Sequence, residues 1–160
     1  MPLEFNVLGL EEGQKMIEAA MKYTKANDLP PMAIVVADKA GKIIASARMN
    51  GASPRYIDAA HRKAYTAAIF ERDTLGLIEF WGNQERQGHR GPHDWNDRMF
   101  TSLPGGLVVC HGQRGGNLGT WDVVGGIGVA GDDEKAHEGA VASAGLEALG
   151  EGFRHRGDWS

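Results

Sequence analysis

Histidines at four positions have the side-chain type that suits metal binding or proton transfer. His89 and His93 are four residues apart, and imidazole is a frequent ligand of transition metals, so they are a candidate metal site. Gly91 between them opposes a helix that would turn both rings the same way. His61, His93 and His111 are candidates for catalytic acid–base work, because an imidazole titrates near neutral pH. The alternative is that each histidine is an ordinary polar side chain.

Basic side chains accompany an alanine-rich segment that begins after residue 54. Arg48 precedes this segment, and Arg62 and Lys63 interrupt it. A guanidinium matches the two oxygens of a carboxylate and an ammonium supplies a point charge, so the three residues are candidates for ligand binding. In the structural alternative, Arg48 pairs with Asp38 or Asp58 and ties a hairpin to the helix.

A polar segment at about residues 82–103 divides the chain and contains Arg90 and Trp95. Its glycines and Pro92 oppose a long helix. A loop of this length in a compact domain is usually functional or disordered. We expect a lid that places Arg90 and Trp95 over a flat, anionic ligand. A subunit contact uses the same residue types and is the alternative.

Residues 126–131 read GIGVAG and have the spacing of a dinucleotide-binding loop. Asp132 and Asp133 follow directly, where they would repel a pyrophosphate, and too few residues remain for another strand with its ribose-binding acid. We therefore predict close backbone packing at a strand-to-helix turn. The amides of that turn, including the Gly128 amide, are a further candidate for binding a carboxylate.

Composition indicates a globular domain of 160 residues with a net charge of −4. This charge argues against general nucleic-acid binding, which needs a basic surface. Cys110 is the single cysteine, so we expect no internal disulfide, a reducing compartment and a thiol that packs in the core. We see neither a signal-peptide pattern nor an apolar run that could span a membrane, so we predict a cytoplasmic protein without a membrane partner.

Hydrophobic periodicity predicts the elements that position these residues. Helices are expected at residues 10–27, 56–72 and 132–149, with a shorter apolar segment at 75–81. Strands are expected at 32–37, 42–48, 107–110 and 121–129, as two hairpins. Hairpins make antiparallel sheets, so the predicted fold class is α+β. Residues 1–150 form one domain in this interpretation, with the inserted loop at about 82–103, and 151–160 form a C-terminal tail.

Four motifs occur in a fixed order along the chain: IVVADKAG at 34–41, RMNG at 48–51, KAYTA at 63–67 and VGGIGVAG at 124–131. Together they resemble the GlcG/HbpS family of small haem-binding or haem-degrading proteins, which includes the C-terminal module of PduO-type proteins. The resemblance implies a profilin-like three-layer fold, with helices flanking an antiparallel sheet of about five strands. It also implies a homo-oligomer and makes haem a candidate cofactor, beside a transition metal or none.

Three interpretations of function follow from these observations. In the first, the protein holds haem or another flat carboxylated molecule in a cationic, aromatic pocket, with weak haem degradation as an optional activity. In the second, it is a cofactor-free lyase, isomerase or hydrolase acting on a small organic acid, with histidine acid–base catalysis and arginine carboxylate binding. In the third, it is a structural or regulatory subunit without a ligand. The expected partner is a small molecule, not a nucleic acid.

Overall fold

A five-stranded antiparallel sheet forms the centre of the protein, with strand order β2-β1-β4-β3-β5. The computed structural model describes residues 8–91, 96–112, 122–131 and 137–156. Its strands are β1 (Met32–Asp38), β2 (Ile43–Arg48), β3 (Gly106–His111), β4 (Asp122–Gly131) and β5 (Phe153–Arg154). Its helices are α1 (Leu10–Ala26), α2 (Arg55–Phe70), α3 (Thr74–Arg86) and α4 (Glu138–Glu147).

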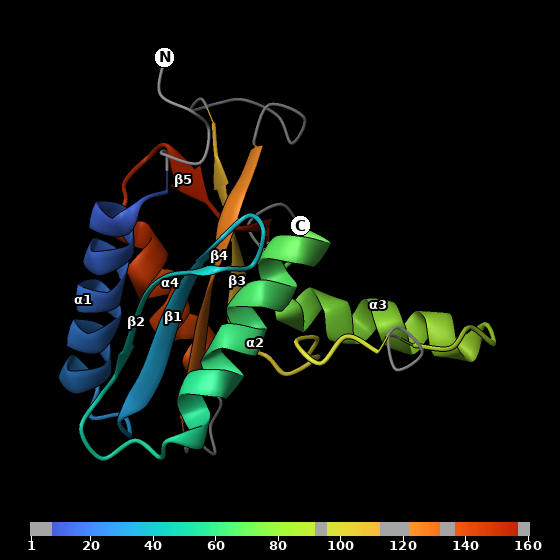
Figure 1. The fold of residues 1–160 in the computed structure, drawn as a ribbon, viewed down its shortest axis with the longest axis horizontal. Helices are drawn as coiled ribbons and strands as arrows, with labels where there is room; N and C mark the ends of the chain where they lie inside the picture. Colours follow the sequence, from blue (N-terminus) through green and yellow to red (C-terminus); the bar gives the residue numbers. More distant parts are fainter. Residues whose placement is uncertain (1–7, 92–95, 113–121, 132–136, 157–160) are drawn as a thin grey trace.

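Helices cover both faces of the sheet and give the fold three layers. Figure 1 shows α1 and α4 on one face and α2 on the other. On the first face, Ile34 and Val36 of β1 belong to a core that includes Met16 of α1 and Val141 of α4. On the second face, Val35 packs in a smaller cluster made largely of alanines. Both faces of β1 are buried, which accounts for the continuous apolar run of its sequence.

Glycines in β4 allow α2 to lie directly against the sheet. A Cβ atom added at Gly128 would lie 2.0 Å from the carbonyl oxygen of Ala60, and one at Gly126 would lie 2.4 Å from that of Ala64. Only a strand without side chains at these positions, facing a helix lined by alanine, permits this backbone contact. The prediction of close packing is therefore confirmed, but the glycine motif lies inside β4 and not at a strand-to-helix turn.

The α+β class, the antiparallel sheet and the two hairpins of the sequence analysis are confirmed. Two boundaries differ. Residues 82–86, expected to belong to a loop, extend α3. Residues 153–154, expected to belong to a tail, pair with β3 as the edge strand β5. Of the predicted helix at 132–149, residues 132–136 lie outside the described residues, and α4 spans Glu138–Glu147. None of the described helices combines the length and apolar character needed to cross a lipid bilayer.

Helix α3 leaves the body of the fold on the side of α2 and extends away from the sheet (Figure 1). The chain continues past Gly82 as helix, although a glycine costs about 1 kcal/mol in a helix interior. Aromatic packing offsets this cost, because the Trp81 ring meets Phe70 of α2 and Phe100 edge-to-face, with ring centroids 6.3 and 6.1 Å away.

Candidate functional site

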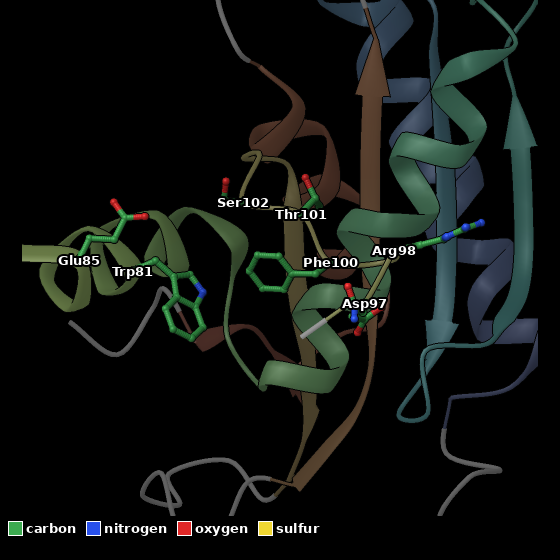
Figure 2. A pocket seen from close by; sticks show the side chains of 8 residues that line it. Trp81, Glu85, Asp97, Arg98, Phe100, Thr101 and Ser102 are labelled. Carbon is green, nitrogen blue, oxygen red and sulfur yellow. The ribbon is translucent and has the colours of Figure 1, made fainter. Parts of the chain in front are cut away.

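A pocket with a volume of about 760 Å³ lies between α3 and the segment 96–102. The rings of Trp81 and Phe100 pack edge-to-face and together form one wall of this space (Figure 2). Phe70 supports Phe100 from α2, with ring centroids 5.0 Å apart. The described lining consists of Trp81, Glu85, Asn96, Asp97, Arg98, Phe100, Thr101 and Ser102. The pocket thus offers an aromatic wall and several polar groups, and we call it the aromatic pocket.

Side chains of the KAYTA motif on α2 hold the segment 96–102 in place. The Tyr65 hydroxyl donates to Asp97 Oδ2 at 2.9 Å, and the Thr101 amide donates to Thr66 Oγ1 at 3.1 Å. The second Asp97 oxygen accepts from the Met99 amide at 2.9 Å. Burial, followed by the bond to Asp97 and its charge, raises the pKa of Tyr65, so the phenol remains a donor at neutral pH. The motif therefore fixes one wall of the pocket.

The aromatic wall carries less positive charge than the sequence analysis predicted. In Figure 2 the Arg98 side chain points away from Trp81 and Phe100. Haem iron would need an axial histidine, cysteine, methionine or tyrosine, and the described lining of this pocket has none. Within the described ranges, no group of three or more metal-ligating residues could hold a metal ion. His93 and Trp95, predicted for this region, lie outside the described residues.

A second pocket, of about 240 Å³, lies where α2, β4 and α4 meet. We call it the lysine pocket, because Lys63 and Glu138 are both buried in its wall, with 4% and 8% of their surfaces exposed. The Lys63 ammonium donates to the carbonyl oxygen of Val129 at 2.8 Å. Burial lowers the pKa of Lys63, and the Glu138 charge opposes that shift. Its described lining is Tyr56, Ala59, Lys63, Leu103, Pro104, Ala130, Gly131 and Glu138.

An aspartate–histidine pair connects the start of α3 to the C-terminal segment. His155 Nδ1 donates to Asp73 Oδ2 at 2.7 Å, and Asp73 Oδ1 accepts from the buried Val108 amide at 3.0 Å. The two residues are far apart in the sequence, and no motif joins them. Both carboxylate oxygens of Asp73 accept hydrogen bonds from other elements, so we interpret this pair as a structural link between α3, β3 and the segment that follows β5.

Several predicted site residues lie apart from both pockets. Arg48 is exposed on the edge strand β2, and the described residues include no ion pair joining it to Asp38 or Asp58. Figure 1 shows β2 at one edge of the sheet and α3 beyond the other edge, so the structure does not bring Arg48 to the aromatic pocket. Arg62 is exposed on α2. His61 Nε2 donates to the carbonyl oxygen of Gly41 at 3.0 Å, in the turn between β1 and β2.

The remaining candidates also occupy distinct environments. His89 and Arg90 are exposed after the end of α3. His111 ends β3 and packs on Phe153, with ring centroids 4.9 Å apart. Gly128 pairs with Val35 of β1 and Gly106 of β3, which corrects its predicted place among exposed amides at the start of a helix.

Cys110 is buried in β3, which confirms that its thiol packs in the core. Burial raises the pKa of this thiol to about 11. Of the predicted site residues, Lys63 is the one that the structure places in a described pocket. Sequence reasoning missed Glu138 and Tyr56, which line the lysine pocket and come together only through the folding of segments far apart in the chain.

Comparison with known proteins identifies the family. A family model described as "Haem degrading protein HbpS-like" matches residues 8–147. Protein GlcG of Escherichia coli (strain K12) is 31% identical over 114 residues, which cover 71% of this chain and 80% of GlcG. A crystal structure of a double mutant of Streptomyces reticuli HbpS has a TM-score of 0.68 and 28% identity, covering 89% of this chain and 87% of that one. The structure of a PduOC–haem complex has a TM-score of 0.67 at 19% identity, covering 86% of this chain and 91% of that one, and shows likeness of fold. This chain therefore belongs to the HbpS-like family.

Proposed function

We propose that the protein binds a flat, carboxylated molecule in the aromatic pocket, and that haem is the first ligand to test. The observation that carries this proposal is the space of about 760 Å³ bordered by the packed rings of Trp81 and Phe100. Binding pockets for small molecules commonly have volumes of about 300–1,000 Å³ and aromatic walls. The family model is described as haem degrading, and one protein of the same fold was solved as a haem complex.

The described lining fits the plane of a porphyrin better than it fits iron. Trp81 and Phe100 offer apolar ring surface, and the Thr101 and Ser102 hydroxyls could donate to a carboxylate. The described lining has no histidine, cysteine, methionine or tyrosine that could ligate haem iron. We therefore expect the ring system and its carboxylates to supply most of the binding free energy. That His93, Trp95 and Arg90 add to the site as a lid remains part of this proposal.

A comparison of haemin with metal-free protoporphyrin IX tests the proposal. Trp81→Ala and Phe100→Ala should each weaken the binding of both ligands about threefold to tenfold, because an aromatic contact contributes about 0.5–1.5 kcal/mol. Phe153→Ala is the matched control, since Phe153 packs on His111 away from this pocket. Absorbance and fluorescence titrations give the dissociation constants, and thermal unfolding confirms that each variant is folded.

Two outcomes would contradict the proposal. The first is unchanged affinity in both the Trp81 and the Phe100 variant. The second is binding of haemin that is far tighter than binding of the metal-free porphyrin, because an iron ligand would then dominate recognition.

A homo-oligomer and a cytoplasmic location remain proposals as well. Helix α3 exposes 68% of Leu75 and 41% of Ile78, so it offers an apolar surface for a second copy of the chain. The buried, unpaired thiol of Cys110 is compatible with a reducing compartment. Sedimentation of the wild type and of Leu75→Glu would measure the first point, since a charge at the subunit contact should shift the protein toward monomer.

An enzyme acting on a small organic molecule is the second candidate function. The observation that favours it is the lysine pocket rather than the predicted histidines, because His61 and His111 contact other parts of the fold.

A further inference from the structure

The lysine pocket contains a reactive type of side chain that flat-ligand binding does not use. Lys63 reaches from α2 to β4, where its Nζ donates to the carbonyl oxygen of Val129 at 2.8 Å. The Glu138 carboxylate, from the first turn of α4, interacts with the same ammonium. Both side chains are more than nine-tenths buried and both border a cavity of about 240 Å³. A buried charged pair at the wall of an open space is a common arrangement in reactive sites.

The surroundings of Lys63 make its amine easier to deprotonate than that of an exposed lysine. Most of the other described lining residues are apolar: Ala59, Leu103, Pro104 and Ala130. Burial among them lowers the pKa of Lys63 from its usual value, and the carboxylate of Glu138 offsets only part of this shift. A neutral lysine amine in an apolar pocket is a nucleophile toward carbonyl carbon. The geometry therefore supplies both the nucleophile and a place for its reaction partner.

Gly105 keeps the space beside the amine open. It has a φ of +111°, a region that other residues rarely adopt. A Cβ atom at Gly105 would lie 3.1 Å from Lys63 Nζ and 2.9 Å from the Cβ atom of Glu138. Any side chain at this position would therefore crowd the pair and displace the amine.

The charges of the pocket indicate which class of molecule it would take. Among its described lining residues Lys63 is the single basic side chain, and Glu138 would repel an anion. Because Lys63 is paired with Glu138, the pocket offers no net positive charge to an anion. The volume of about 240 Å³ suits a molecule of a few heavy atoms. A small, uncharged aldehyde or ketone meets all of these conditions.

We propose that the lysine pocket captures a small neutral carbonyl compound as a Schiff base on Lys63 Nζ. The lone pair of the amine adds to the carbonyl carbon, and one proton moves from nitrogen to the former carbonyl oxygen, which gives a carbinolamine. Glu138 then transfers a second nitrogen proton to the hydroxyl, the C–O bond breaks, water leaves and the C=N bond forms. One carbonyl compound and one amine give one imine and one water, without an oxidant or reductant. The proposal is independent of ligand binding in the aromatic pocket.

Reductive trapping with propanal as the probe tests this proposal. The protein is incubated with propanal and cyanoborohydride near neutral pH, and propylated lysines are located by peptide mass spectrometry. We expect propylation of Lys63 to exceed that of the exposed Lys22 and Lys42 several-fold. This excess should shrink as the pH approaches 10.5, the ordinary lysine pKa, where the exposed amines also lose their protons. Glyoxylate, which carries a carboxylate, should label Lys63 less than propanal does.

Three variants distinguish a reactive site at Lys63 from a Lys63–Glu138 pair that only stabilises the fold. Ala59→Leu narrows the pocket without touching the amine and should abolish labelling of Lys63 alone, whereas Ala26→Leu, at an exposed position of α1, should leave it unchanged. Glu138→Gln should slow labelling of Lys63 several-fold in folded protein, because its amide moves no proton. Labelling of Lys63 no greater than that of Lys22, or labelling unaffected by Ala59→Leu, would overturn the proposal.

Discussion

Gly128→Ala tests the contact between α2 and β4, on which the positions of both pockets depend. The added methyl group would lie 2.0 Å from the carbonyl oxygen of Ala60 and 2.6 Å from the amide nitrogen of Ala64. Both are backbone atoms of α2, so no side chain can rotate to make room. These distances are shorter than a van der Waals contact by roughly an ångström or more, so the helix would have to move away from the sheet by about that amount.

Overpacking of a core typically costs about 1–3 kcal/mol, and a clash with backbone belongs at the upper end of that range. We therefore expect Gly128→Ala to lower the free energy of unfolding by about 3 kcal/mol. For a protein of this size that loss corresponds to a decrease in Tm of about 6–12 °C. Calorimetry or circular dichroism during heating measures it directly.

Gly76→Ala is the matched control for this experiment. Gly76 lies in α3, and a Cβ atom there would meet nothing within 4 Å. Alanine is the better helix former, so this change should raise the free energy of unfolding by up to about 1 kcal/mol. If Gly128→Ala melts within a degree or so of the wild type, α2 does not lie on β4 as described, and the argument from the glycines fails.

The structure determines the direction of the result in three further experiments. Asp73→Ala should lower the free energy of unfolding, measured by urea titration, by about 1–3 kcal/mol, because the buried Val108 amide and His155 lose their acceptor. Asp73→Asn keeps one side-chain oxygen as an acceptor, so it should lower the free energy of unfolding by less. Cys110 should resist iodoacetamide near pH 8 in the folded protein and react quickly in guanidinium, since burial raises its pKa to about 11; rapid alkylation without denaturant would contradict its burial. Burial lowers the pKa of Lys63 on folding, so between its folded pKa and 10.5 the unfolded chain binds more protons than the folded protein. The free energy of unfolding of the wild type, relative to that of Lys63→Met, should therefore rise with pH through that window. A difference that stays constant or falls would refute the lowered pKa.

Local patterns were sufficient to predict most of the fold. The continuous apolar run of β1, the turn at Asp38 and the alanine-rich helix each have a signal that depends on near neighbours in the sequence. The end of α3 and the strand β5 were not predicted, because their stability comes from contacts with distant residues. Aromatic packing of Trp81 on Phe70 continues the helix beyond Gly82, and pairing with β3 turns Phe153 and Arg154 into a strand.

The candidate sites were harder to predict for the same reason. Lys63 was identified from its motif, but its partner Glu138 is on another helix, and no spacing rule connects the two. Trp81 of α3 and Phe100 of the segment 96–102 form one wall of the aromatic pocket, and no local pattern pairs them. Arg48 was grouped with these residues because of its charge, although β2 and α3 lie on opposite sides of the sheet. Residue type indicated the chemistry, and only the topology determined which residues meet.

The position of a bound porphyrin is the measurement that tests the proposed function most directly. Metal-free protoporphyrin IX is diamagnetic, so its ring current shifts the NMR signals of nearby residues without broadening by iron. We predict large shifts for the indole of Trp81, the ring of Phe100 and the amides of Thr101 and Ser102, with Tyr56 and His155 unaffected. Shifts confined to residues outside the aromatic pocket, or no shifts at all at saturating porphyrin, would contradict the proposal.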